Sequence, residues 1–151
     1  MKASDYTNKI ILGDCLEVMK QMPDKCVDLV LTDPPYNTEN IGPNARVYEG
    51  QRMKLPDEEY GKWMADWFRE AQRIAKVVVF TPGIANTHFY PQPFWQLCWH
   101  KPATVSFNRM GGYNAWEPIF IYGKPAKGKR LGQDYILQNT LIQQFFKKYL
   151  I

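Results

Sequence analysis

The stretch V-D-L-V-L-T-D-P-P-Y, residues 27–36, decides how the rest of the chain is interpreted. Residues 27–32 are mostly aliphatic and β-branched, which is typical of a buried β-strand. Asp33-Pro34-Pro35-Tyr36 follows at once, and the prolines cannot continue a strand because they have no backbone N–H to donate. Open α/β sheets bind ligands just outside the carboxyl ends of their strands. The stretch therefore predicts a strand that ends in a ligand-binding turn, although a turn with no ligand would share this local pattern.

The residues before this stretch predict a strand and a helix. K-I-I-L-G-D at 9–14 is a short apolar run that ends in a Gly-Asp pair, as expected for a second buried strand. Asp14 is placed to cap a short helix over residues 15–22, which Pro23 closes. A strand, a helix and a strand in this order predict a parallel pair of strands with a helical crossover.

The residues after it continue the alternation. Residues 37–56 are polar and without a period, which indicates a loop, whereas apolar residues at helical spacing from Asp57 predict a long helix with Asp57 as its cap. Further strands are predicted at 76–81, 94–100 and 117–122. We therefore predict a single α/β domain spanning 1–151, with a Rossmann-like, mainly parallel sheet and flanking helices.

Composition excludes several classes of protein. The 151 residues are 45% hydrophobic and 23% charged, as in ordinary globular domains, and the net charge of +4 favours an anionic partner only weakly. Cys15, Cys26 and Cys98 form no C-x-x-C pair, which favours reduced thiols in a cytoplasm, and two histidines are too few to indicate a zinc site. No signal peptide or membrane span is expected.

The motif and its surroundings resemble a known family. T-D-P-P-Y-N at 32–37, preceded by I-L-G-D-C-L-E-V-M-K-Q-M-P, is similar to the N-terminal, target-base half of the β-class (permuted) DNA amino-methyltransferases. T-P-G at 81–83, W-H-K-P at 99–102 and W-E-P-I-F-I-Y-G-K at 116–124 add to the resemblance. It covers residues 8–125 and leaves a basic linker and a predicted C-terminal helix, 125–151, outside the match.

The resemblance implies methyl transfer from S-adenosylmethionine to an exocyclic amino group of DNA. Adenine N6 is preferred over cytosine N4, because Asp rather than Ser stands at position 33. The lone pair of this amine is delocalised into the ring, so the amine is a poor nucleophile. The Asp33 carboxylate and the Pro34 carbonyl would each accept one amino N–H and so localise the lone pair on the nitrogen. Pro35 would stiffen this backbone, and Tyr36 would stack on the flipped base. No metal and no covalent cysteine is required.

The resemblance also implies binding residues. Asp14, Cys15, Thr32 and Asp33 would contact the cofactor, although Asp14 has the alternative role of helix cap. Asn37 begins a region that closes over cofactor and base in the family. The other residues that could meet DNA are Arg46, Arg52, Lys54, Lys101 and Asn108. For the charged members of this set, simple exposure to solvent is the competing interpretation.

Two elements of the family are not found in the sequence, namely H-P-x-x-K-P and the F-x-G-x-G cofactor loop. We therefore expect an incomplete S-adenosylmethionine methyltransferase fold. Three explanations stay open: a truncated product without activity, one part of a split enzyme completed by a second chain, and a minimal variant that binds the cofactor differently. The expected partners are DNA and either such a second chain or further copies of this chain in a homo-oligomer. The competing functions are methylation of RNA or of a protein amide, and a non-catalytic nucleic-acid-binding or regulatory role. The expected location is the cytoplasm, in association with a prokaryotic or phage nucleoid.

Overall fold

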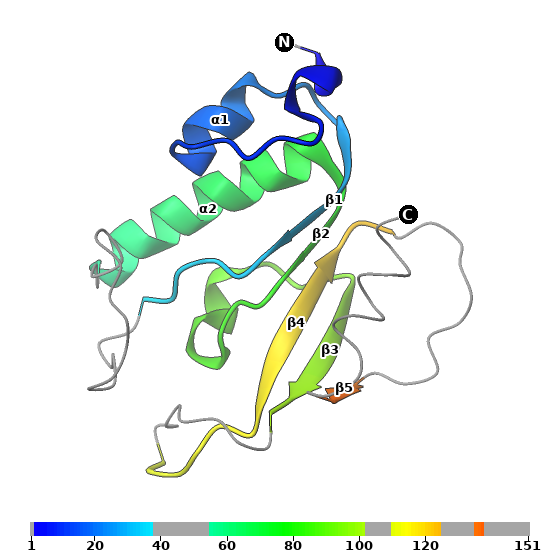
Figure 1. Cartoon of the computed structure of the whole chain (residues 1–151). Helices are drawn as coiled ribbons and strands as arrows, with labels where there is room; N and C mark the ends of the chain where they lie inside the picture. The colour runs from blue at the N-terminus through cyan, green and yellow to red at the C-terminus, as the bar shows by residue number, and fades with distance from the viewer. Residues whose placement is uncertain (1, 38–54, 102–109, 125–134, 138–151) are drawn as a thin grey trace.

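The computed structural model describes residues 2–37, 55–101, 110–124 and 135–137 (Figure 1). The predicted C-terminal helix and nearly all of the basic linker lie outside these ranges. The described elements are η1 (Ala3–Tyr6), α1 (Cys15–Gln21), β1 (Val27–Thr32), α2 (Asp57–Ile74), β2 (Ala75–Phe80), η2 (Ile84–Phe89), β3 (Trp95–His100), β4 (Trp116–Tyr122) and β5 (Tyr135–Leu137). The predicted helices at 15–22 and from Asp57, and four of the five predicted strands, are thus present, with bounds shifted by about one residue.

The strands form one sheet in the order β1-β2-β4-β3-β5 within the described residues. The pairs β1–β2 and β3–β5 are parallel, whereas β2–β4 and β3–β4 are antiparallel. The α/β class with flanking helices is confirmed, but the sheet is mixed rather than mainly parallel. The physical reason is that β3 and β4 follow one another in the chain and pair antiparallel, with His100 opposite Trp116, so no crossover is needed between them.

The predicted strand at residues 9–14 is wrong. This segment has no strand in the structure, and the side chains of Ile10 and Leu12 are fully exposed, at 104% and 101% of their reference areas. Apolar composition favours a strand, but a strand forms only where a neighbour accepts its backbone hydrogen bonds. The parallel pair instead joins β1 to β2 through α2, with Thr32 opposite Phe80. As the last described strand of the sheet, β1 is only half-buried.

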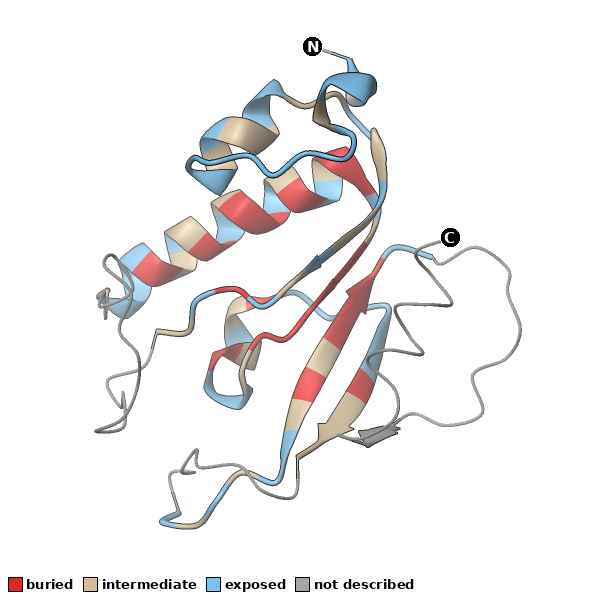
Figure 2. Cartoon of the chain, in the orientation of Figure 1, coloured by how far each residue is buried: buried red, intermediate tan, exposed pale blue. Residues whose placement is uncertain are grey.

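Helix α2 packs one face of the sheet and forms the main core (Figure 2). Its apolar stripe meets β2 and β4 around Phe80, which is completely buried and whose ring lies 5.2 Å from that of Trp67. Most of the aromatic surplus is therefore used in packing. The prediction that Asp57 caps this helix is wrong: Pro56 occupies the N-cap, and Asp57 is the first helical residue.

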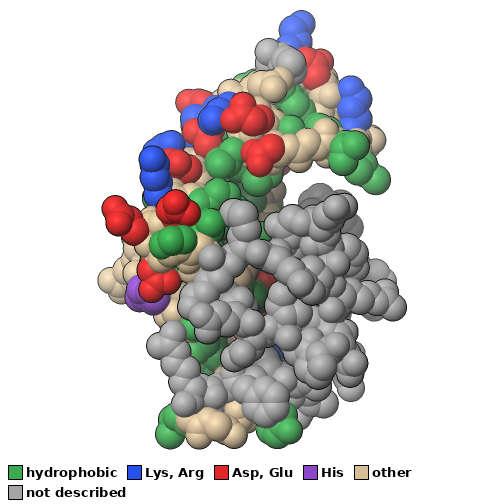
Figure 3. All heavy atoms as spheres, turned by 90° about the vertical axis from the view of Figure 1, so that its left-hand side faces the viewer, with side chains coloured by type: hydrophobic (Ala, Val, Ile, Leu, Met, Phe, Trp, Pro, Cys, Tyr) green, Lys and Arg blue, Asp and Glu red, His purple; other side chains and the backbone are tan. Residues whose placement is uncertain are grey.

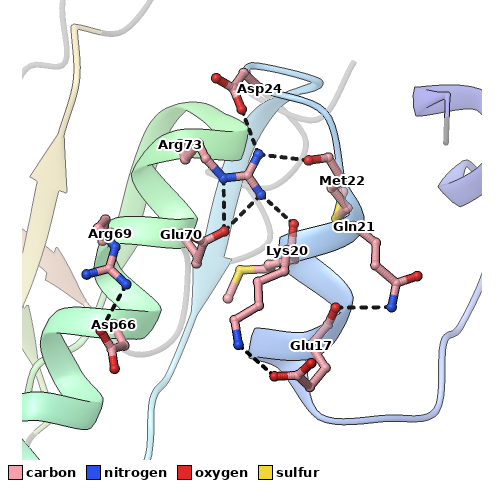
Figure 4. Close-up of polar contacts among 10 residues, drawn as sticks. Glu17, Lys20, Gln21, Met22, Asp24, Asp66, Arg69, Glu70 and Arg73 are labelled. Atoms are coloured by element: carbon pink, nitrogen blue, oxygen red, sulfur yellow. Dashed lines mark hydrogen bonds and ion pairs between the residues drawn. The ribbon is translucent and has the colours of Figure 1, made fainter.

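Arg73 ties the end of α2 to the turn that precedes β1 (Figure 4). Its guanidinium donates to the carbonyls of Met19 and Met22, at 2.6 and 2.8 Å, and pairs with Asp24 and Glu70. These contacts hold α1, which packs on α2, and they fix where β1 begins. The position of the motif at the other end of β1 follows from this anchoring.

Candidate functional site

The motif Asp33-Pro34-Pro35-Tyr36 lies at the carboxyl end of β1, as the sequence predicts. Because β1 and β2 are parallel and Thr32 is opposite Phe80, the first residues after both strands begin at the same level of the sheet. This register brings Thr81 beside Asp33, although 48 residues of sequence separate them. The site is therefore built by two neighbouring strand ends.

Two hydroxyl groups hold one oxygen of the Asp33 carboxylate. Tyr36 Oη and Thr81 Oγ1 both donate to Asp33 Oδ1, and the two hydroxyl oxygens are 3.1 Å apart. Burial, and then the hydrogen bond to Asp33, raise the pKa of Tyr36 above its usual value, so its proton stays in place as a donor. Within the described residues, Asp33 Oδ2 accepts no hydrogen bond, and the residue is exposed. This oxygen remains able to accept from a ligand.

The two prolines are held from α2. Tyr60 Oη donates to the Pro35 carbonyl at 2.9 Å, and the Asn86 amide reaches the same hydroxyl at 3.4 Å. Tyr60 and Asn86 are buried, and burial raises the pKa of Tyr60 to about 12. Pro34 is itself buried. Helical periodicity assigns Tyr60 to the core, and no local signal in the sequence indicates that its hydroxyl positions the motif.

Gly83 packs against the ring of Tyr36. Its backbone has a φ of 73°, and a Cβ at this position would lie 3.0 Å from Tyr36 Cδ1. A side chain here would be strained by the backbone conformation and would push on the ring. The T-P-G segment that follows β2 therefore contacts the motif twice, through the Thr81 hydroxyl and the Gly83 backbone.

Asn37, directly after the motif, is hydrogen-bonded to residues just before and at the start of α2. Its side chain donates to the Leu55 carbonyl and accepts from the Leu55 N–H, both at 2.9 Å, and it contacts Asp57 Oδ1 at 3.3 Å. The amide is thus already used within the protein. Its contact with DNA stays a prediction. Of the other predicted DNA contacts, Arg46, Arg52, Lys54 and Asn108 lie outside the described residues.

Lys101 is paired within the protein. Its ammonium group lies 2.5 Å from Glu117 Oε2 and 3.7 Å from the centre of the Trp99 ring, and both charged side chains are less than one-fifth exposed. After burial and the Asp33 hydrogen bond, Glu117 is among the minor causes that raise the pKa of Tyr36. Contact between Lys101 and DNA remains a prediction, and its charge is already balanced by Glu117.

Asp14 caps α1, which confirms one of its two predicted roles. Its Oδ1 accepts from the backbone N–H of Leu16 and Glu17, at 2.8 and 3.2 Å. Desolvation, and then the charge of Asp14, raise the pKa of the Cys15 thiol, which therefore stays protonated at neutral pH.

Two carboxylates near the predicted cofactor site have acceptors that suit hydroxyl and ammonium groups of the predicted cofactor. Asp14 and Asp33 each keep one carboxylate oxygen without a partner in the described part of the chain, and such oxygens accept hydrogen bonds from hydroxyl and ammonium groups. In the same ranges, no group of three His, Cys, Asp or Glu side chains could hold a metal ion.

The surface over the helices carries mixed charge. Figure 3 shows Lys and Arg beside Asp and Glu on this face, and ion pairs such as Lys20–Glu17 and Arg69–Asp66 alternate along α1 and α2. Such a surface has no single-sign field to attract a polyanion. No helix in the described ranges is long and apolar enough to cross a membrane.

Comparison with known proteins shows similarity to DNA methyltransferases. No family model matches the chain. The chain is 32% identical to type II methyltransferase M.HinfI of Haemophilus influenzae over 146 residues, and 29% identical to M.BamHI of Bacillus amyloliquefaciens over 135 residues. It is 28% identical over 140 residues to the DNA adenine methyltransferase YhdJ of Escherichia coli.

The matches cover most of this chain but less than half of each relative. They include 83%, 87% and 85% of the chain, and 41%, 28% and 45% of the respective relatives. The similarity therefore concerns one part of a longer kind of protein.

Proposed function

We propose that the chain forms the target-base half of an S-adenosylmethionine-dependent DNA methyltransferase of the β-class, which acts on an exocyclic amino group. The observation that carries the proposal is the Asp33 carboxylate at the end of β1, which is held through Oδ1 and keeps Oδ2 for a ligand. The similarity to DNA methyltransferases supports it. Adenine N6 is the preferred target because of Asp33 and because one relative is a DNA adenine methyltransferase.

The chemistry assigned to the motif is orientation of the amine. Asp33 Oδ2 and the Pro34 carbonyl each accept one amino N–H, which draws the nitrogen toward tetrahedral geometry and frees its lone pair. The base must first leave the duplex, and it stacks on the Tyr36 ring face opposite Gly83, which stabilises it by about 1–3 kcal/mol. The Tyr60 hydroxyl holds Pro35 and thereby limits movement of the neighbouring Pro34 carbonyl.

S-adenosylmethionine supplies an electrophilic methyl group on a sulfonium. Asp14, Cys15 and Thr32 are the residues proposed to hold it beside Asp33, with the free carboxylate oxygens as acceptors. The rest of the cofactor site is proposed to come from a segment like the part of the relatives that this chain does not match, carried by a second chain. The proposed setting is bacterial or phage restriction-modification in the cytoplasm.

A second candidate is a nucleic-acid-binding or regulatory subunit that has no activity alone. The observation that favours it is that the F-x-G-x-G pattern does not occur in these 151 residues. Such a subunit would keep the base pocket and depend on a partner for the cofactor.

The test measures transfer of labelled methyl from S-adenosylmethionine to duplex DNA. We expect Asp33→Asn to lower the rate by at least about 10²-fold, because it replaces an anionic acceptor with an amide. Asp28→Asn is the matched control: Asp28 lies on β1, the strand that Asp33 follows, its side chain is 87% exposed, and it pairs only with Lys76 among the described residues. Near-normal transfer by Asp33→Asn would refute the assignment.

Calorimetric titration separates the two candidates. Binding of S-adenosylmethionine by the chain alone supports the methyltransferase. DNA binding without cofactor binding or transfer supports the subunit. If the chain binds neither DNA nor cofactor, alone or with a second chain that carries the missing loop, the proposed function is wrong.

A further inference from the structure

We propose that Thr81 is a positioning residue that orients the Asp33 carboxylate toward its substrate. The inference rests on the proposed function and deepens it, because it adds a residue from a second strand end to the site. Thr81 belongs to the segment after β2 and is not part of the motif at 33–36. Its role follows from the hydrogen bonds at Asp33.

The geometry requires two donors. Tyr36 reaches Asp33 Oδ1 from within the same turn, whereas Thr81 reaches it from the segment directly after β2. A single hydrogen bond leaves the carboxylate free to pivot about the shared oxygen. Two donors from different elements fix the oxygen in space, and Oδ2 then has a defined direction. Because β1 and β2 are in parallel register at Thr32 and Phe80, the distance between the two elements is itself fixed.

Burial makes the bond from Thr81 hard to replace. Thr81 is 8% exposed, so its hydroxyl has little access to water and needs a partner within the protein. The partner it has is an otherwise exposed carboxylate. The position of the carboxylate is therefore set by a buried group rather than by solvent.

The chemical type of the donors also suits this role. Within the described residues no Lys or Arg pairs with Asp33, and Lys101 pairs with Glu117 instead. Hydroxyl donors orient a carboxylate without cancelling its charge, whereas an ammonium or guanidinium group would do both. Asp33 thus keeps the negative charge with which it attracts the N–H groups of an amine.

The experiment compares Thr81→Val with Thr81→Ser. Val keeps the shape and removes the donor, and Ser keeps the donor and removes the methyl. The three-bond couplings that report χ1 of Asp33 are measured by NMR in labelled protein, without DNA or cofactor. We expect one rotamer in the wild type and in Thr81→Ser, and averaging over rotamers in Thr81→Val. A single unchanged Asp33 rotamer in Thr81→Val would overturn the proposal.

Two further measurements complete the test. Circular dichroism checks that the variants fold. If Thr81→Val does not fold, Tyr36→Phe is used in its place, because it removes the other hydroxyl donor to Asp33. In methyl transfer we expect Thr81→Val to lower kcat by about 10–100-fold with KM nearly unchanged, and Thr81→Ser to restore most of the rate. An equal loss in both variants would indicate a role in packing and would overturn the proposal. The couplings need no activity, so failure of the proposed function would be seen separately.

Discussion

Replacing Tyr60 with Phe removes one hydroxyl and keeps the ring in the core. That hydroxyl donates to the Pro35 carbonyl at 2.9 Å and receives the Asn86 amide at 3.4 Å. Tyr60 and Asn86 are only 3% and 4% exposed, so water does not readily take the place of the hydroxyl. Leaving such partners without a hydrogen bond costs about 1–3 kcal/mol of the free energy of unfolding. For a chain of this size the midpoint temperature should fall by about 2–12 °C.

Tyr90→Phe is the matched control. Tyr90 belongs to the same aromatic core and is 7% exposed, but its hydroxyl has no hydrogen-bond partner among the described residues. Removing this hydroxyl deletes a buried polar group that makes no hydrogen bond, so the free energy of unfolding should stay the same or rise slightly. The difference between the two variants isolates the link between α2 and the motif from the general effect of losing a buried hydroxyl.

The assay is urea unfolding at neutral pH, followed by tryptophan fluorescence, for the wild type and both variants. Hydrogen exchange at the Asn37 amide, two residues beyond Pro35, should also be faster in Tyr60→Phe, because the motif is released locally. Equal midpoints for Tyr60→Phe and Tyr90→Phe would refute the reasoning, since the Pro35 link would then contribute nothing.

Three further results are expected. Gly83→Ala should cost about 1–3 kcal/mol in thermal unfolding, because it strains a positive φ and presses on Tyr36. Asp14→Ala should cost about 1 kcal/mol, whereas Asp14→Ser should retain most of the cap, as measured by denaturant unfolding. The free energy of unfolding should fall as pH rises above about 10. Burial raises the pKa of four tyrosines in the folded protein, so the unfolded chain loses their protons at lower pH; these are Tyr36, Tyr60, Tyr90 and Tyr122. Each tyrosine lowers the free energy of unfolding by up to about 1.4 kcal/mol per pH unit. Phenolate absorbance measured beside unfolding tests this, and a midpoint that does not change with pH would contradict it.

Local patterns predicted the parts of the fold that depend on local chemistry. The period of apolar residues in α2 and the proline pair after β1 identify their elements without knowledge of any neighbour. The segment 9–14 failed for the opposite reason: its composition suits a strand, but a strand also requires a neighbouring backbone, which sequence composition does not encode.

The site was predicted only in part, because its supports come from distant residues. Asp33 and Tyr36 stand in one tetrapeptide and could be identified together. Thr81 and Tyr60 contact the motif across 48 and 25 residues of sequence, through a strand register and a helix position that a single sequence does not reveal. Lys101 was expected at DNA as an isolated cation, and its pairing with Glu117 depends on the antiparallel pairing of β3 and β4.

The position of β1 at the end of the described sheet has a consequence for any strand that comes to lie beside it. Neighbouring strands are about 4.8 Å apart, so a parallel newcomer on this side would finish one strand spacing from Asp33. Its following loop would begin beside the Asp33–Tyr36 turn. Extending the sheet on this side would therefore also bring new groups next to the motif.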